Sequence, residues 1–348
     1  MRVLFDGRWL SGNVPSGRRW LHSMLPALHR ARPDWDLVVA VSPDAELGPL
    51  DPSVCRPHVR RGMGLPGVVA GVWLNREGRR IGADVVVSQF FGAYRRTRVP
   101  MVAVVHDALW VEHPDWFASR VRAQLAFVGP SLRGSHVVTV SGASADQVVA
   151  AGLSSSRPSV VHNGVDATAT PPAPDGRSGI LVVGRPNVRK NLVTAIRAWE
   201  DADVDEPLVV VGCARAEAEE VVGHALPDEV VFAGRVDDEA LQRHYATARM
   251  LLAPSLGEGF SLPPIEAMVH GTPVVASAIP VHRELYDGVA VLVDPLDVGA
   301  WSEAIRNLLA APSDWEARHV AGLRRAAEFS WDHAAASLAT VLEARVTA

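Results

Sequence analysis

The stretch Met250–Ser277, M-L-L-A-P-S-L-G-E-G-F-S-L-P-P-I-E-A-M-V-H-G-T-P-V-V-A-S, decides the fold. It reads as a buried strand, a glycine-containing loop, a helix and a second buried strand. Pro263 and Pro264 suit the first turn of that helix, because a proline there loses no intrahelical hydrogen bond. Continuous apolar strands joined through a helix are typical of a parallel sheet covered on both faces. The stretch therefore predicts an α/β unit.

The loop of the same stretch has the features of a ligand site. Gly257 and Gly259 let backbone N–H groups approach a ligand closely, and the following helix presents the positive end of its dipole, an arrangement that favours a diphosphate. Glu258 and Glu266 lie eight residues apart, one in the loop and one on the helix. A carboxylate has two oxygens that accept hydrogen bonds, which suits a pair of adjacent sugar hydroxyls.

Valine-rich apolar runs alternate with helix-like segments along most of the chain. This alternation predicts two doubly wound α/β domains, over residues 1–170 and 171–330, with a final helix over 331–348 capped by Ser330. The break between the domains, residues 166–178, reads D-A-T-A-T-P-P-A-P-D-G-R-S and predicts a linker. The predicted strands are Val3–Phe5, Leu37–Val41, Val85–Ser88, Met101–Val105, His136–Val140, Ser159–His162, Ile180–Val183, Leu208–Val211, Val230–Ala233, Met250–Ala253, Pro273–Ala276 and Ala290–Val293.

Composition narrows the class of protein. A hydrophobic fraction of 48% with 21% charged residues is typical of a globular chain. The two cysteines, Cys55 and Cys213, lie far apart and lack metal-ligand spacing, so we expect no disulfide framework and no zinc site. No export signal precedes the first strand and no apolar run reaches membrane-spanning length. We therefore expect a cytoplasmic protein. We also expect no metal or other cofactor and no nucleic-acid partner.

Charge is distributed unevenly along the chain. Residues 1–174 hold 19 arginines against 13 acidic residues, a net charge of +6, whereas the remainder carries −11. A solvated face, a site for an anionic acceptor and a contact with the inner face of a membrane all remain open for this excess. The arginines concerned are Arg56, Arg60, Arg61, Arg76, Arg79, Arg80, Arg95, Arg96 and Arg98.

A second motif, V-G-R-P-N-V-R-K-N-L over Val183–Leu192, joins a strand that ends at Gly184 to a helix that begins near Asn191. Cations at a helix N-terminus oppose its dipole, so their presence there favours an anionic ligand. Lys190 is the single lysine among 34 basic residues. Arginine serves wherever a generic positive charge suffices, so the position predicts a need for a compact, rotatable ammonium group.

The pattern E-G-F-S-L-P-P-I-E-A-M-x-x-G-x-P-V-V-A-S resembles the E-x7-E signature of glycosyltransferase family 4, within the GT-B superfamily. The resemblance implies two Rossmann-like domains facing a cleft, with a C-terminal helix that crosses back to the N-terminal domain. It implies that Glu258 contacts the hydroxyls of the transferred sugar and that Glu266 binds the ribose hydroxyls of the nucleotide. The loop amides expected to face the donor are those of Gly259, Phe260, Ser261 and Leu262, with Ser261 standing where glycine is frequent.

The second motif resembles the donor loop of the same family, in which an arginine and a lysine clamp the diphosphate. The resemblance assigns this role to Arg185 and Lys190, with Arg189 beside them. Two cations would neutralise the charge that grows on the departing nucleoside diphosphate, and this would support departure without a metal.

Three further stretches resemble family positions. V-A-V-V-H-D-A-L-W is a buried strand that ends in a polar pair, and the family's H-D position makes His106 a candidate contact of the donor sugar. F-D-G-R-W-L-S-G-N-V-P-S-G-R-R-W-L resembles the family's first loop, where Gly17 would let the backbone reach the phosphate. V-F-A-G-R-V-D-D lies where members hold the base, so we expect Val236 to contact it.

The resemblance implies a retaining, metal-independent glycosyltransferase that moves a hexosyl group from a nucleotide-diphosphate sugar to a hydroxyl by same-face substitution. Glu258, His106, Arg185 and Lys190 would position the donor and stabilise charge. The first loop and the stretch D-A-L-W-V-E-H-P resemble mannosyltransferase-like members of the family most closely, and this resemblance favours GDP-mannose, with UDP-sugars open. The acceptor is an unidentified sugar, lipid-linked or small molecule. A nucleotide-sugar epimerase and a non-catalytic sugar-nucleotide-binding protein are the alternatives.

Overall fold

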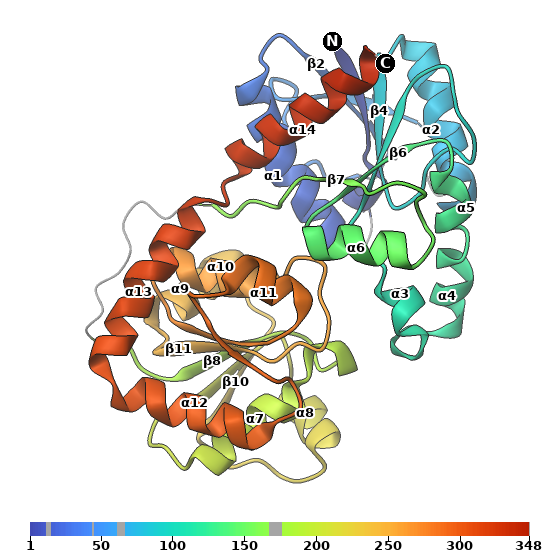
Figure 1. Cartoon of the computed structure of the whole chain (residues 1–348). Coiled ribbons are helices and arrows are strands. Elements are labelled where there is room, and N and C mark those ends of the chain that lie inside the picture. The colour runs from blue at the N-terminus through green and yellow to red at the C-terminus, as the bar shows by residue number, and fades with distance from the viewer. Residues whose placement is uncertain (12–14, 44, 61–66, 167–175, 348) are drawn as a thin grey trace. The chain divides into compact units, whose positions relative to one another are not determined.

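The computed structural model describes residues 1–11, 15–43, 45–60, 67–166 and 176–347. The chain divides into two compact units (Figure 1). The first unit comprises Met1–Gly164 and Ser330–Ala348, and the second comprises Val165–Phe329. Most of the predicted linker, and with it the expected boundary at residue 170, lies outside the described residues.

The first unit is built on a seven-stranded sheet with the order β3-β2-β1-β4-β5-β6-β7, and its described strand pairs are all parallel. Its central strands are rich in Val, Leu, Met and Ala side chains that are almost wholly buried, as a sheet covered on both faces requires. The strands are β1 (Arg2–Asp6), β2 (Asp36–Val41), β3 (Arg56–Val59), β4 (Val85–Gln89), β5 (Met101–Val105), β6 (His136–Thr139) and β7 (Ser159–Val160).

Each strand predicted for this unit is present, but β3 was not predicted. It reads R-P-H-V, lies at the edge of the sheet and pairs only with β2 among the described strands. An edge strand tolerates proline and polar side chains, so it lacks the apolar run by which the other strands are recognised.

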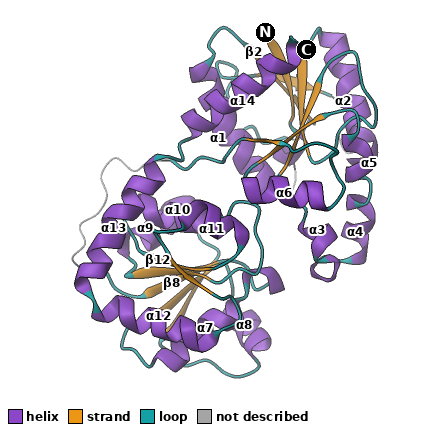
Figure 2. Ribbon diagram, viewed as in Figure 1, coloured by secondary structure: helices purple, strands orange, loops and turns teal. Residues whose placement is uncertain are grey.

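Helices cover both sheets, as Figure 2 shows for each unit by itself. In the first unit α14 packs against α1, and Ser330 caps α14 by accepting a hydrogen bond of 3.1 Å from the His333 N–H. The described helices of this unit are α1 (Pro15–Ala31), α2 (Gly67–Ile81), α3 (Leu109–Glu112), α4 (Ser119–Leu125), α5 (Val128–Leu132), α6 (Gly142–Ala150) and α14 (Trp331–Val346), with 3₁₀ turns η1 (Arg8–Ser11) and η2 (Pro114–Trp116).

The second unit has a six-stranded parallel sheet with the order β10-β9-β8-β11-β12-β13. Every strand predicted for it is present. The strands are β8 (Ile180–Val183), β9 (Leu208–Val211), β10 (Val230–Gly234), β11 (Met250–Ala253), β12 (Val274–Ser277) and β13 (Val291–Val293). The helical segments are η3 (Val188–Lys190), α7 (Leu192–Ala202), α8 (Arg215–Val222), α9 (Asp238–Thr247), α10 (Leu262–Val269), α11 (Pro280–Tyr286), α12 (Val298–Ala310) and α13 (Pro312–Ala327).

Both sheets therefore show the doubly wound strand order. Successive strands are added first on one side of the unit's first strand and then on its other side. This change of side lies between β1 and β4 in the first unit and between β8 and β11 in the second. Ligands of such sheets bind outside the carboxyl ends of the strands at this switch point. None of the described helices is long and apolar enough to cross a membrane.

Candidate functional site

The loops that follow β8 and β11, the two strands at the switch point of the second unit, are joined by hydrogen bonds to backbone carbonyl oxygens. The Leu256 N–H donates to the Arg189 carbonyl oxygen at 2.8 Å, and Asn191 Nδ2 donates to the Pro254 carbonyl oxygen at 3.1 Å. Asn187 caps η3 by accepting from the Lys190 N–H at 3.0 Å. The backbone of the cationic loop is thus fixed against the loop that carries Glu258.

The Glu258 carboxylate is surrounded by donors. Its Oε1 lies 2.7 Å from Lys190 Nζ and accepts from the Ser255 hydroxyl at 2.9 Å, while its Oε2 lies 3.1 Å from Arg189 Nη1. Glu258 is 7% exposed, against 31% and 20% for the side chains of Arg189 and Lys190. One buried carboxylate therefore faces two partly exposed cations.

These neighbours set the ionisation of Glu258. Burial alone would raise the pKa of its carboxyl group, because a low-dielectric environment disfavours the charged form. The Lys190 ammonium and the Arg189 guanidinium, with hydrogen bonds from Lys190 and Ser255, outweigh burial and lower the pKa of Glu258 to about 2. The side chain is therefore an anion throughout the neutral range, ready to accept hydrogen bonds.

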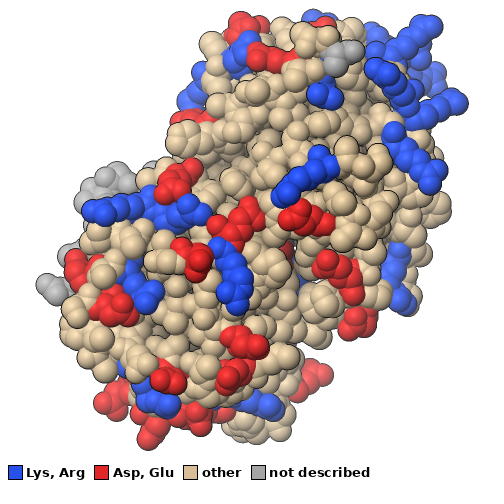
Figure 3. All heavy atoms as spheres, in the orientation of Figure 1, with Lys and Arg blue, Asp and Glu red and all other residues tan. Residues whose placement is uncertain are grey.

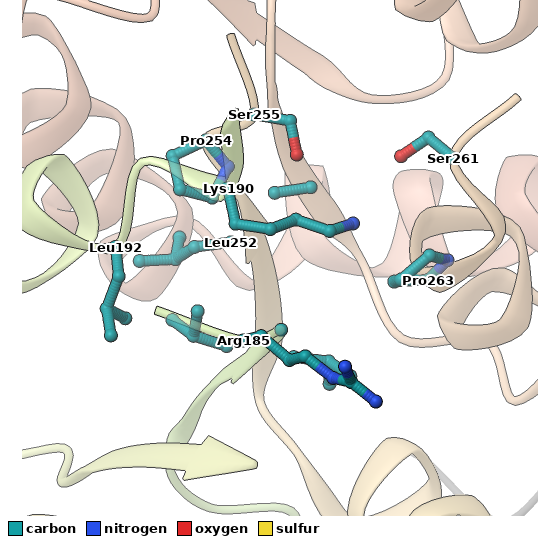
Figure 4. Close-up of a pocket in the computed structure, with 12 residues that line it drawn as sticks. Arg185, Lys190, Leu192, Leu252, Pro254, Ser255, Ser261 and Pro263 are labelled. Carbon is teal, nitrogen blue, oxygen red and sulfur yellow. The ribbon is translucent and has the colours of Figure 1, made fainter. Parts of the chain in front are cut away.

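A small pocket lies beside this ion pair (Figure 4). Arg185 and Lys190 point into it, with Ser255, Ser261 and Pro263 on its other sides. Arg185 is exposed and follows β8 directly, whereas Ser261 and Pro263 belong to the start of α10. Two cations at a helix N-terminus form a site for an anion. The structure therefore brings the predicted residues Arg185 and Lys190 to one pocket, next to Glu258.

Ser261 precedes α10 in a left-handed backbone conformation, with φ 67° and ψ 75°. Its carbonyl oxygen accepts a hydrogen bond of 2.6 Å from the buried Tyr286 hydroxyl. A residue with a Cβ atom is strained in this region, whereas glycine is not. The preference for glycine at this position of the family signature therefore has a backbone reason.

The remaining predicted loop residues lie around the start of α10, where Gly259 and Phe260 are buried and Leu262 is half-buried. The Phe260 ring packs against Phe329 with centroids 5.8 Å apart. Leu262 is the first residue of α10. These positions are consistent with loop amides as ligand contacts, which stay a prediction.

Glu266 lies in the middle of α10 and is 4% exposed. Its Oε2 accepts a hydrogen bond of 2.8 Å from the hydroxyl of Tyr245 on α9. The carboxylate is thus held in one orientation by a neighbouring helix. Its contact with a nucleotide ribose remains a prediction.

Val236 is half-buried in the loop between β10 and α9, at the same carboxyl edge of the sheet as Arg185. The neighbouring Asp237 caps α9, accepting from the Ala240 N–H at 2.8 Å. The Asp237 carboxylate therefore has a structural role. Base contact by Val236 stays a prediction.

The other predicted residues lie in the first unit, at its own switch point. His106 follows β5, and its Nε2 is 3.1 Å from Gln89 Oε1 at the end of β4. Gln89 Nε2 in turn donates to the Gly17 carbonyl oxygen at 3.2 Å. Burial lowers the pKa of His106 to about 4, so its imidazole is neutral at pH 7. Gln89 thus links His106 and Gly17.

Gly17 lies in the first turn of α1, under the ring of Trp9. A Cβ atom at this position would come within 2.8 Å of a Trp9 ring carbon. Close packing therefore accounts for a glycine here, and an approach of its backbone to phosphate stays a prediction. Phe90, with φ 63°, stands between Trp9 and His106 at ring distances of 6.0 and 5.5 Å.

Sequence reasoning overlooked several residues of these sites. Ser255, Tyr245 and Gln89 were not predicted, although each binds a predicted residue. A polar residue ending a buried strand is a signal that could have found Gln89. No local pattern could have identified Tyr245, because it reaches Glu266 only when α9 packs against α10. Among the described residues no group of His, Cys, Asp or Glu is arranged to hold a metal ion.

Comparisons with known proteins agree with the motifs. The family model described as Glycosyltransferase Family 4 matches residues 17–169, and the model described as Glycosyl transferases group 1 matches residues 177–311. The chain belongs to glycosyltransferase family 4. Its predicted GT-B fold, with two Rossmann-like units, is confirmed.

Relatives and a solved structure show how far the likeness extends. The O-antigen chain mannosyltransferase RfbU of Salmonella typhimurium is 32% identical over 217 residues, 60% of this chain and 60% of that protein. The MMP alpha-(1->4)-mannosyltransferase of Mycolicibacterium hassiacum is 32% identical over 276 residues, 72% of this chain and 67% of that protein. The structure of sucrose-phosphate synthase from Thermosynechococcus elongatus is 20% identical with a TM-score of 0.77, over 99% of this chain and 98% of that chain.

Proposed function

We propose that this chain is a retaining glycosyltransferase that moves a hexosyl group from a nucleotide-diphosphate sugar to a hydroxyl of an acceptor. The observation that carries the proposal is the ion-paired Glu258 beside the pocket lined by Arg185 and Lys190. A buried, ionised carboxylate next to an anion pocket supplies acceptors for sugar hydroxyls beside donors for a diphosphate. That is the pair of contacts a sugar diphosphate requires.

In the proposed reaction the bond between the anomeric carbon and the diphosphate oxygen breaks. A bond from that carbon to the acceptor oxygen forms on the same face, and the acceptor proton passes to the departing phosphate oxygen. Arg185 and Lys190 stabilise the charge that grows on this leaving group, which makes a metal ion unnecessary on this proposal. Glu258 and His106 orient the sugar, and neither acts as a nucleophile.

The donor we favour is GDP-mannose, because two of the relatives are named mannosyltransferases. A UDP-sugar is the alternative. Glu266, held by Tyr245, is the proposed ribose contact, and Val236 at the same sheet edge is the proposed base contact. The acceptor is a sugar, lipid-linked or small molecule that binds the first unit.

The test is a transfer assay with the purified full chain. GDP-mannose and UDP-hexoses are each incubated with and without a panel of acceptor glycans, and products are examined by NMR through the one-bond coupling at the anomeric carbon. A product with the anomeric configuration of the donor supports the proposal. An inverted product contradicts the retaining mechanism. An epimerised donor formed without acceptor identifies an epimerase instead.

We also propose that the chain is cytoplasmic and meets an anionic membrane surface through an arginine groove on the first unit. Four arginines, Arg76, Arg79, Arg80 and Arg95, line a hollow of about 790 Å³, and no acidic side chain is among the described residues that line it. The Tyr94 hydroxyl beside them is buried and has no hydrogen-bond partner in the described structure. In Figure 3 basic side chains gather on the side of this unit where α2 lies in Figure 1.

Exposed valines on the same helix, Val69 and Val72, add an apolar component to this contact. Vesicle sedimentation tests it with neutral phosphatidylcholine and with the same lipid containing an anionic phospholipid. Anionic vesicles should bind the chain, and Gln at Arg76 and Arg79 should reduce binding roughly tenfold or more. Gln at the exposed Arg120 and Arg122 of α4 is the matched control. Equal losses in the two variants would contradict a specific role of the groove.

A further inference from the structure

Three cations lie at the candidate donor site, and two of them, Lys190 and Arg189, contact Glu258. Arg185 and Lys190 line the pocket, whereas Arg189 is not among the described residues that line it. Arg189 instead contacts Glu258 Oε2, the oxygen opposite the one that Lys190 and Ser255 contact. We propose that Arg189 is a positioning residue, which keeps Glu258 ionised and directed at the sugar while Lys190 turns to the diphosphate. The inference rests on the proposed function.

Glu258 and an incoming diphosphate compete for Lys190. Its ammonium lies 2.7 Å from Glu258 Oε1 and also lines the pocket. A diphosphate entering that pocket brings negative charge close to a carboxylate that is itself an anion. Both anions draw on the same ammonium, whose hydrogen bonds are then shared or transferred. A carboxylate that loses its cation in a buried position takes up a proton or turns away.

Arg189 is suited to prevent this loss. A guanidinium stays charged at every physiological pH and holds a fixed geometry toward a carboxylate. The Arg189 backbone is anchored by the hydrogen bond from the Leu256 N–H to its carbonyl oxygen, and Leu256 lies in the loop that carries Glu258. The side chain and its partner therefore keep their relative position when the pocket fills. On this proposal Lys190 binds the diphosphate, and Arg189 keeps its ion pair with the Glu258 carboxylate.

The test separates binding of the diphosphate from binding of the sugar. Calorimetry gives Kd for two ligand pairs, GDP with GDP-mannose and UDP with UDP-glucose, and the pair that the wild-type chain binds is used for the variants. Arg189→Gln should bind the nucleoside diphosphate within about threefold of wild type but lose roughly tenfold in affinity for the nucleotide sugar. Arg189→Lys should recover part of that loss, and Arg185→Gln, the matched control, should weaken both ligands alike.

A pH series supplies a readout that a purely structural role would not change. The diphosphate of a nucleotide sugar does not titrate between about pH 4 and 8, so its affinity reports the ionisation of the protein. Among the described residues, His282 and Tyr286 of α11 are the other titratable groups coupled to Glu258; burial lowers the pKa of His282 to about 4, as it does for His106, and raises the pKa of Tyr286. The wild-type chain carries the same groups and sets the baseline. The ratio of the Arg189→Gln Kd to the wild-type Kd should rise toward the acid end because the pKa of Glu258 rises.

Two results would overturn the inference. Equal losses of nucleoside diphosphate and nucleotide sugar in Arg189→Gln would make Arg189 part of the diphosphate clamp. Unchanged affinities with an unchanged pH profile would remove it from the site. A wild-type chain that binds neither pair would instead overturn the proposed function and, with it, this role.

Discussion

Replacement of Glu258 by glutamine is the substitution that bears most directly on the site. Glutamine keeps the shape of the side chain and removes its charge. In the structure both carboxylate oxygens accept from donors, Oε1 from Lys190 and Ser255 and Oε2 from Arg189. An amide has one acceptor oxygen and two N–H donors, so its nitrogen would face a cation. We expect Glu258→Gln to reduce transfer strongly and to leave nucleotide binding intact.

The magnitude follows from the hydrogen bonds that are lost. A hydrogen bond from a sugar hydroxyl to a carboxylate contributes about 1.5–3 kcal/mol. Its loss corresponds to a decrease of roughly 10–150-fold in kcat/KM. The nucleoside diphosphate should bind at least as well as before, because Lys190, freed from the carboxylate, is then available to the phosphates. The side chains of Arg189 and Lys190 are 31% and 20% exposed, so water still solvates them when the carboxylate is removed. This limits the loss of folding stability in Glu258→Gln.

The pH dependence of stability gives a second measure of the same change. The pKa of Glu258 is about 2 in the fold, below its ordinary value of 4.5, so the folded state holds this proton less strongly than the unfolded state. Its stabilising contribution is present above pH 4.5 and is lost as the pH falls toward 2. Glu258→Gln should lack this part of the acid denaturation profile.

The assay combines steady-state transfer with calorimetry of the nucleoside diphosphate. Glu303→Gln, an exposed position on α12, controls for the loss of one negative charge. Unchanged kcat/KM in Glu258→Gln would refute the assignment of Glu258 to the sugar. A loss of nucleoside diphosphate affinity as large as the loss of activity would place the residue on the phosphates.

Three further predictions follow. Lys190→Ala should weaken nucleoside diphosphate binding roughly tenfold or more, since it removes a charge-assisted contact, and calorimetry that shows no change would exclude it from the pocket. The pKa of His106 is about 4 in the fold and 6.5 in an unperturbed group, so its contribution to stability is present above pH 6.5 and is lost as the pH falls toward 4. His106→Asn should flatten the decrease in melting temperature over that window, and an equally steep decrease would show that His106 titrates normally. Ser261→Gly should change the free energy of unfolding by less than about 1 kcal/mol, because relief of strain at φ 67° offsets the flexibility of glycine, whereas Ser261→Val should destabilise markedly. Equal melting temperatures for these two variants would contradict the backbone argument.

The parts of the fold that the sequence predicts best are those with one dominant signal. Strands β8 and β11 are uninterrupted apolar runs, and α10 has two prolines in its first turn, so all three are recognisable from local residues alone. Strand β3 lacks such a signal because its proline and polar side chains are allowed only at an edge. Its place depends on the neighbouring β2, which no local pattern reveals.

The candidate site divides in the same way. Motifs predicted Glu258 and Lys190 separately, but their contact joins segments that meet only when β8 and β11 pair. Other interactions of the site also depend on tertiary structure, because their partners come from different helices and strands. They are the ion pairs that keep Glu258 charged, the hydrogen bond from Tyr245 to Glu266 and the contact between His106 and Gln89. The sequence therefore predicts which residues take part in the candidate site. It does not predict which side chains they contact or whether they are ionised.

The central claim is that a nucleoside diphosphate binds the pocket beside Glu258, and calorimetry with GDP, UDP, ADP and dTDP tests it most directly. We predict that the wild-type chain binds one of these nucleotides without added metal and that Lys190→Ala loses most of that affinity. Failure of all four to bind, or binding that Lys190→Ala leaves unchanged, would contradict it.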